Sequence, residues 1–239
     1  MRKQLEFIYE DEDLIAINKP AGMLSVPDRM QSEESLKDIL QCKYEKIFVV
    51  HRLDKETSGV IVYAKHEEAH KMLSQQFENR ETTKYYAGIV TGSLPDVEGV
   101  IDLPIIEHPV KKGLMTTSHK GKPSITGFKV LEDFRSYSYI RFNLLTGRTH
   151  QIRVHMKHLG HPLACDPLYG TGQPVFISDI KKRYNLSKKE EEERPMLNRL
   201  ALHAEQLTVK QANGQELNFE APLPKDMRAL LQQLRKTVE

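Results

Sequence analysis

The sequence predicts an α+β fold in which strands outnumber helices. Short stretches rich in β-branched and aromatic residues recur along the chain, whereas helical spacing of apolar residues is found less often. No internal repeat and no Gly/Ser-rich linker interrupts the 239 residues. We therefore expect one continuous domain over residues 1–239, with a division into two lobes left open.

The expected strands are short and rich in Val, Ile, Leu, Phe and Tyr, which favour a pleated, half-buried surface. In chain order they are Leu14–Asn18, Phe48–Val50, Val60–Ala64, Tyr85–Val90, Ile125–Leu131, Tyr139–Leu144 and Leu207–Val209.

Two helices are expected early in the chain. Ser32 is the expected N-cap of a helix that ends at Gln41, and a second helix is expected over residues 66–80. Apolar residues at three- and four-residue spacing mark the inner faces of both helices. They are Leu36, Ile39 and Leu40 in the first helix, and Ala69, Met72, Leu73 and Phe77 in the second.

A third helix is expected to begin after Thr149, its predicted N-cap, and to end at Gly160. At about 100° per residue, Arg153 shares a stripe with His150 and is predicted to point away from the apolar side. The apolar residues expected to face the core are Ile152, Met156 and Leu159.

The overall charge gives no argument for a nucleic-acid partner, because 35 Lys and Arg residues stand against 33 acidic residues and the net charge is only +2. A local basic surface is expected over residues 148–161, which are rich in Arg, Lys and His. Residues 185–194 are charged and non-periodic, so we expect a solvated loop or an exposed helix there.

Cysteine content and apolar runs point to a reduced compartment. Cys42 and Cys165 are too few for a disulfide framework, and the start, Met1–Glu6, lacks the apolar core of a signal peptide. The longest apolar runs have the length of strands and not of membrane spans. We therefore expect a soluble, cytoplasmic protein with no membrane contact.

The segment His51–Gly59 carries the clearest signal for chemistry. It places Asp54 among basic groups, between the expected strands Phe48–Val50 and Val60–Ala64. Loops on rigid strands commonly hold active sites. The alternative is a plain turn, in which polar side chains cap the backbone and Gly59 closes the turn.

A second long motif, Leu144–His155, opens the third expected helix. Together with the His-Arg-Leu-Asp and Thr-Ser-Gly of the first segment, it resembles the two signature motifs of the RluA family of RNA pseudouridine synthases. Shorter matches extend this resemblance over nearly the whole chain. They are Ile17–Gly22, Lys84–Tyr86, His161–Leu163, Asp166–Gly170 and Leu202–Ala204.

The resemblance implies a mixed, mainly antiparallel sheet with flanking helices and a central catalytic cleft. It also implies that a uridine in RNA is converted to pseudouridine: the bond from ribose C1′ to uracil N1 breaks, and the base re-attaches through C5. No cofactor and no metal are expected, because this reaction has no net redox change. The implied partner is a stem-loop of ribosomal or transfer RNA. No obligate protein partner is inferred, and the oligomeric state stays open with a monomer as the default. The accessory N-terminal RNA-binding module that many members carry is not expected here.

By the same resemblance, the catalytic residues are Asp54, Tyr86 and Arg153. Whether the Asp54 carboxylate attacks C1′ or C6, or removes a C2′ proton, stays open. Arg153 would pair with Asp54 and hold it ionised. Tyr86 would stack on the flipped uracil, and Tyr85, one position earlier, is the second candidate. Only one of the two can serve, because neighbouring strand residues point to opposite faces. The plainer alternatives are a surface salt bridge for Arg153 and core packing for Tyr86.

The expected substrate-binding residues come from both long motifs. Arg52 would fill the stack that the flipped base vacates, although a solvated loop charge is the plainer reading. Arg148, before the third helix, is expected to bind a phosphate, because a helix N-terminus favours anions. Thr57, His150 and Gln151 complete the set.

Two other functions compete with this assignment. A metal-dependent hydrolase is disfavoured, because the His residues of 150–161 lack the spacing of a zinc motif and no acidic residue lies between Arg148 and Cys165. A catalytically silent RNA-binding protein of the same fold is the stronger alternative. The presence of Asp54, Tyr86 and Arg153 together speaks against it.

Overall fold

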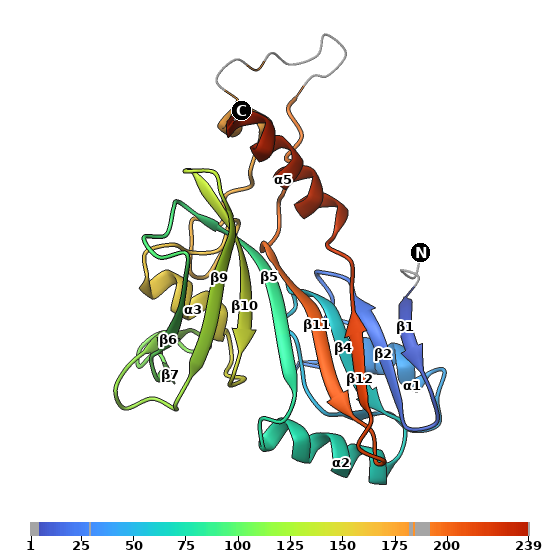
Figure 1. The fold of residues 1–239 in the computed structure, drawn as a ribbon. Helices are drawn as coiled ribbons and strands as arrows, with labels where there is room; N and C mark the ends of the chain where they lie inside the picture. The colour runs from blue at the N-terminus through green and yellow to red at the C-terminus, as the bar shows by residue number, and fades with distance from the viewer. Residues whose placement is uncertain (1–4, 29, 182–183, 185–191, 239) are drawn as a thin grey trace. The chain divides into compact units, whose positions relative to one another are not determined.

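The computed structural model describes residues 5–28, 30–181, 184 and 192–238 (Figure 1). The chain divides into two compact units. Unit 1 comprises Met1–Tyr86, Asn143–Leu145 and His203–Pro222, and unit 2 comprises Ala87–Phe142, Thr146–Leu202 and Leu223–Glu239. Most of the predicted charged segment 185–194 lies outside the described residues, and the single catalytic domain stays a prediction.

Unit 1 is built on a mixed sheet with the strand order β1-β2-β4-β11. Its pairs are antiparallel, except that β4 and β11 run parallel. Two further strands join it, β3 on β4 and β12 on β11. The strands are β1 (Glu6–Glu10), β2 (Leu14–Lys19), β3 (Phe48–Val49), β4 (Ser58–Ala64), β11 (Leu202–Lys210) and β12 (Glu216–Glu220).

Both faces of this sheet are buried, and each is covered by one helix. Helix α2 (Glu67–Glu78) packs on the face that carries the even-numbered residues of β2 and β4. Helix α1 (Leu36–Gln41) packs on the face that carries the odd-numbered residues. All seven residues of β4 are therefore buried, which explains its continuous apolar run.

The predicted start of the first helix was wrong. The N-cap of α1 is Ser35, whose hydroxyl accepts from the Asp38 amide at 3.2 Å, while the Asp38 carboxylate accepts from the Ser35 amide at 2.9 Å. This reciprocal capping satisfies two amides at once. Ser32 donates its hydroxyl proton to Asp28 instead.

Unit 2 contains the strand order β5-β10-β9-β6 and a separate hairpin of β7 and β8. The division between the units falls within β5, after Tyr86. The strands are β5 (Thr83–Thr91), β6 (Glu98–Asp102), β7 (Ile105–Glu107), β8 (Met115–Thr117), β9 (Ile125–Asp133) and β10 (Tyr137–Leu144). A mixed, mostly antiparallel sheet with few helices is thus confirmed.

The third predicted helix is α3 (Gln151–His158), but its N-cap is His150 and not Thr149. His150 adopts the left-handed conformation, with φ of 56°, and offers no side-chain cap. Ile152 and Met156 are buried as predicted, whereas Leu159 is 40% exposed, because the helix ends before it.

Two helices of unit 2 were not predicted, the short α4 (Ile177–Ile180) and the C-terminal α5 (Lys225–Val238). Helix α5 inserts its apolar stripe into the core around Ile89 and Ala201. The stripe consists of Met227, Leu230, Leu231 and Leu234. Within the described part of the chain, no helix is long and apolar enough to cross a membrane.

The contact between β4 and β11 depends on Gly59. Its φ is +113°, and a Cβ atom there would lie 2.1 Å from the carbonyl oxygen of Ala204, its partner in the parallel pair. One residue earlier, Ser58 Oγ lies 2.9 Å from His203 Nδ1, and His203 Nε2 donates to the Ala221 carbonyl at 3.1 Å. Any side chain at position 59 would therefore push β11 away from β4.

We predict that Gly59→Ala lowers the free energy of unfolding by at least about 3 kcal/mol, because backbone strain and overpacking add. The matched control is Gly214→Ala in the same unit, where φ is +83° but no atom lies within 4 Å of the added Cβ. It should cost only about 1–2 kcal/mol, the strain of the left-handed conformation. Urea titrations of both variants measure the difference, and equal losses would contradict the close-approach argument.

Candidate active site

The predicted catalytic segment lies in unit 1 as a loop that leads from β3 into β4, and its last two residues, Ser58 and Gly59, already belong to β4. Asp54 is partly buried and Arg52 is exposed. Thr57 is 2% exposed, and its amide donates to the Asp54 carbonyl at 3.1 Å, which closes a turn. The loop therefore combines the expected turn with a partly buried aspartate.

The backbone is held on both sides of Asp54. Before it, Ser25 Oγ donates to the Leu53 carbonyl at 2.8 Å and accepts from the Leu53 amide at 3.1 Å. After it, the Lys55 carbonyl accepts from Lys19 Nζ at 3.0 Å. These contacts leave little freedom to the backbone that carries the carboxylate.

Lys19 is fully buried, and its ammonium group also donates to the carbonyls of Pro20 at 3.1 Å and Met23 at 2.8 Å. A buried ammonium group requires such acceptors, because its loss of hydration is costly. The sequence analysis included Lys19 only in the match over Ile17–Gly22, without a role, and did not identify Ser25. The signal for Lys19 was a lone lysine at the end of an apolar strand.

His51 anchors the start of the loop and does not carry a charge. Its ring stacks on Phe77 at 4.6 Å between centroids, and its Nε2 accepts from the Val62 amide at 3.0 Å. Burial, together with the nearby positive charge of Lys84, lowers the pKa of His51 to about 3. A ring that stays neutral near pH 7 is suited to an anchoring role and not to proton transfer.

Tyr86 lies close enough to Asp54 for the charge of the carboxylate to affect the pKa of the phenol. Loss of hydration raises the pKa of the Tyr86 phenol above its ordinary value, and the negative charge of Asp54 raises it further. The phenol therefore stays protonated and can donate a hydrogen bond. Its ring packs partly against the apolar cluster around Leu53 and Ile61. Within unit 1 the structure thus brings together two of the predicted catalytic residues.

Arg153 lies in unit 2 and is only 4% exposed, so the alternative of a surface salt bridge on a solvated helix face was wrong. Its Nε and one terminal nitrogen donate to the two carboxylate oxygens of Asp166, both at 2.8 Å. The fully buried Asp166 compensates the guanidinium charge, which allows this face of α3 to pack inside the unit. The pairing of Arg153 with Asp54 stays a prediction.

Gln151 is 3% exposed, and its amide is used entirely within unit 2. Its oxygen accepts from the Thr146 hydroxyl at 2.8 Å and from the Arg148 amide at 3.0 Å. Its nitrogen donates to the Ile125 carbonyl at 3.0 Å and to Thr126 Oγ1 at 2.8 Å. All four hydrogen-bonding positions are filled, so Gln151 shapes the turn before α3 and has no group left for a substrate.

The other two predicted substrate contacts of unit 2 flank this turn. Arg148 is partly exposed, and its Nε donates to the Pro123 carbonyl at 3.2 Å. His150 Nδ1 lies 2.8 Å from the hydroxyl of Tyr169. Tyr169 had entered sequence reasoning only through a family match. Arg148 and His150 both belong to the segment that leads into α3.

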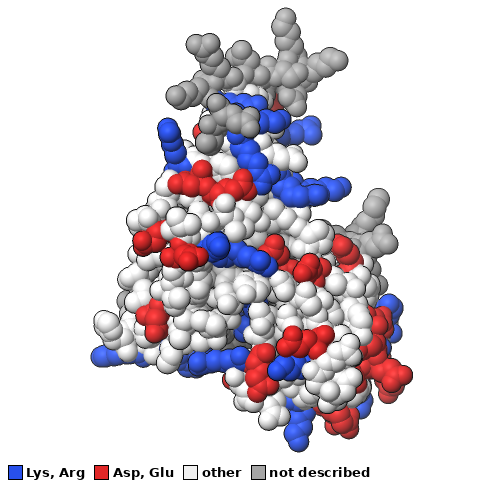
Figure 2. Space-filling model, viewed as in Figure 1, with Lys and Arg blue, Asp and Glu red and all other residues white. Residues whose placement is uncertain are grey.

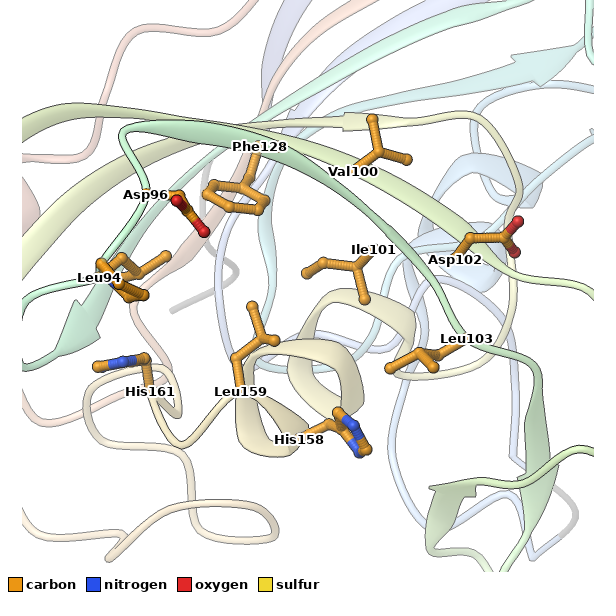
Figure 3. A pocket seen from close by; sticks show the side chains of 12 residues that line it. Leu94, Asp96, Val100, Ile101, Asp102, Leu103, Phe128, His158, Leu159 and His161 are labelled. Atoms are coloured by element: carbon orange, nitrogen blue, oxygen red, sulfur yellow. The ribbon is translucent and has the colours of Figure 1, made fainter.

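A cavity of about 380 Å³ lies elsewhere in unit 2 (Figure 3). Ile101, Phe128 and Leu159 give it an apolar lining, and none of the predicted site residues contributes to it. Its lining residues include Asp96, Asp102, His158 and His161 but no Lys or Arg that would bind a phosphate. We therefore do not assign this cavity to a nucleotide.

Charge on the molecular surface is mixed. On the face shown in Figure 2, basic and acidic side chains are interspersed, in agreement with the net charge of +2. Among the described residues, no group of three His, Cys, Asp or Glu side chains is arranged to hold a metal ion.

Comparison with known proteins identifies the family. The family model for RNA pseudouridylate synthase matches residues 13–158. Ribosomal large subunit pseudouridine synthase D of Escherichia coli strain K12 is 36% identical over 250 residues, which cover 98% of this chain and 72% of that protein. The protein of the same name from Nitrosomonas europaea is 39% identical over 97% of this chain and 65% of its own length.

A solved structure agrees with these sequence matches. Human RNA Pseudouridylate Synthase Domain Containing 4 superposes with a TM-score of 0.75 at 26% identity, over 96% of this chain and 93% of the human chain. The resemblance drawn from the two long motifs is thereby confirmed. The chain belongs to the RluA family of RNA pseudouridine synthases, enzymes that isomerise uridine to pseudouridine in RNA.

Proposed function

We propose that this protein isomerises a uridine of large-subunit ribosomal RNA and that Asp54 is its catalytic residue. The observation that carries the proposal is the Asp54 loop: a partly buried aspartate whose backbone is held by Ser25 and Lys19, next to a protonated Tyr86. The names of the Escherichia coli and Nitrosomonas relatives support ribosomal RNA as the substrate. That substrate agrees with the cytoplasmic location expected from the sequence.

The chemistry needs a carboxylate at the sugar or the base. The C1′–N1 bond breaks, the uracil turns, and C1′ bonds to C5, which loses its proton while N1 gains one. Asp54 supplies the carboxylate, either as the nucleophile or as the base. Tyr86 stacks on the uracil and offers its phenol as a donor. Arg153 acts on the same uridine and favours the ionised form of Asp54.

The remaining residues are proposed to bind the RNA around this uridine. Arg52, which is exposed, fills the vacated stack with its planar guanidinium group. Arg148 and His150 contact the backbone beside α3. Thr57 contributes through the turn that it closes behind Asp54. One chain contains all of these residues, which supports action as a monomer without an obligate protein partner.

We expect Asp54→Asn to lower kcat by at least about a thousandfold, because the carboxylate is lost while the shape is kept. The matched control is Glu56→Gln, which makes the same chemical change two residues further along the loop and should keep full activity. Release of tritium from 5-tritiated uridine in a ribosomal RNA fragment measures turnover, and filter binding should give an unchanged Kd for RNA. An active Asp54→Asn enzyme would refute the catalytic assignment.

We expect Arg52→Ala to lower kcat/KM about tenfold on a stem-loop, because extruding a base costs a few kcal/mol of unstacking that the guanidinium group offsets in part. The loss should be smaller on an unstructured oligonucleotide with the same sequence. The melting temperature should not change, because Arg52 is exposed. Equal losses on both substrates would rule out the stacking role.

The substrate is tested in cells that lack the gene. Pseudouridines in total RNA are mapped by carbodiimide-dependent stops of reverse transcription, with the wild-type protein or Asp54→Asn restored. We expect a site in large-subunit ribosomal RNA that only the wild type recovers. A site in transfer RNA would refute ribosomal RNA as the substrate, and an unchanged map would favour the catalytically silent RNA-binding alternative.

A further inference from the structure

Arg153 is held by two residues of one short segment of unit 2, Asp166 and Tyr169. Asp166 binds the edge of the guanidinium group through two hydrogen bonds, and the guanidinium group lies over the Tyr169 ring, with Cζ 5.0 Å from the ring centroid. The same carboxylate accepts from the amides of Leu168 and Tyr169, at 2.9 and 3.1 Å. The fold of this segment and the position of the guanidinium group therefore depend on each other.

The hydroxyl of Tyr169 connects this pair to two other elements. It accepts from the Met115 amide at 2.9 Å and lies 2.8 Å from His150 Nδ1. Met115 is the first residue of β8, and the hairpin of β7 and β8 also packs on Tyr169 through Ile105. Tyr169 itself is only 4% exposed, so its ring cannot turn without moving these neighbours.

The tip of the hairpin is suited to contact RNA. Lys111 and Lys112 are exposed there, and lysine ammonium groups attract phosphates. The tip is ordered by its own hydrogen bonds: His108 Nδ1 accepts from the Lys111 amide at 3.1 Å, and Glu107 accepts from the Gly113 amide at 2.8 Å. These bonds connect the two lysines to the segment that leads into β8 and Met115.

We propose that Tyr169 is a positioning residue that couples contact between RNA and the β7–β8 hairpin to the orientation of the Arg153 guanidinium group. The path runs from Lys111 and Lys112 through Met115 to the Tyr169 hydroxyl, and from the Tyr169 ring to Arg153. It rests on the proposed function, which assigns Arg153 to the reaction. Asp166 fixes one edge of the guanidinium group, and Tyr169 sets its plane.

The first test uses Tyr169→Phe, which keeps the ring over Arg153 and removes only the hydroxyl. We expect kcat on a ribosomal RNA fragment to fall about tenfold with less than a twofold change in KM. The matched control is Tyr9→Phe in unit 1, which also removes one tyrosine hydroxyl, here bonded to Asp11 at 3.0 Å, and should keep full activity. A Tyr169→Phe enzyme with the wild-type kcat would overturn the proposal.

A double-mutant cycle separates coupling from a merely structural role. Replacing Lys111 and Lys112 by Ala should lower kcat at saturating RNA about tenfold in the wild type but have little further effect in Tyr169→Phe. Losses that multiply to about a hundredfold would overturn the proposal, because independent sites behave additively in free energy.

A spectroscopic measurement does not require Tyr169→Phe to fold. In the otherwise wild-type protein, saturating RNA fragment should shift the Arg153 Nε–H resonance, and the Lys111 and Lys112 replacement should abolish most of that shift. An identical shift in both proteins would overturn the coupling.

Asp54→Asn and Arg153→Gln distinguish this inference from the proposed function. If Asp54→Asn is active, the proposed function fails whatever Tyr169 does. If Asp54→Asn is inactive but Arg153→Gln keeps its kcat, the proposed function of Asp54 stands and the inference is overturned.

Discussion

The close approach of β4 and β11 at Gly59 is the constraint on which unit 1 depends. It joins strands 145 residues apart in sequence, and the bond between Ser58 and His203 continues the contact. The Asp54 loop ends where this contact begins, so the position of the carboxylate follows from the sheet and not from the loop alone. A side chain larger than hydrogen at position 59 would separate the strands and release the end of the loop.

Each unit contains a buried basic side chain whose charge is compensated by hydrogen-bond acceptors of the same unit. In unit 1 the ammonium group of Lys19 is enclosed by three carbonyls, and in unit 2 the guanidinium group of Arg153 is enclosed by Asp166. Such groups are costly to bury and are stable only with all partners in place. Neither arrangement is an efficient way to gain stability, but each defines one geometry, which a reaction with precise positional demands requires.

Burial keeps His51 and Tyr86, two titratable residues of unit 1, in their uncharged forms. His51 is held neutral by desolvation, and the phenol of Tyr86 stays protonated beside the carboxylate. The pKa of His51 is thereby moved below the neutral range in which an ordinary imidazole titrates. The Tyr86 phenol therefore remains a hydrogen-bond donor close to Asp54.

The sequence by itself determined the family, most strands, the second helix and the loop that carries Asp54, because each depends on a contiguous pattern of residues. Only the tertiary structure decided the partners of the buried polar groups. Helical spacing placed Arg153 away from the apolar side of its helix, but spacing cannot show that the side chain is buried against a carboxylate 13 residues away. The contact of Ser25 with Leu53 and the filled amide of Gln151 also join residues more than 20 positions apart. Such polar groups pair because folding removes water from both of them at once. A local sequence pattern cannot show which distant residue will be buried beside a given polar group.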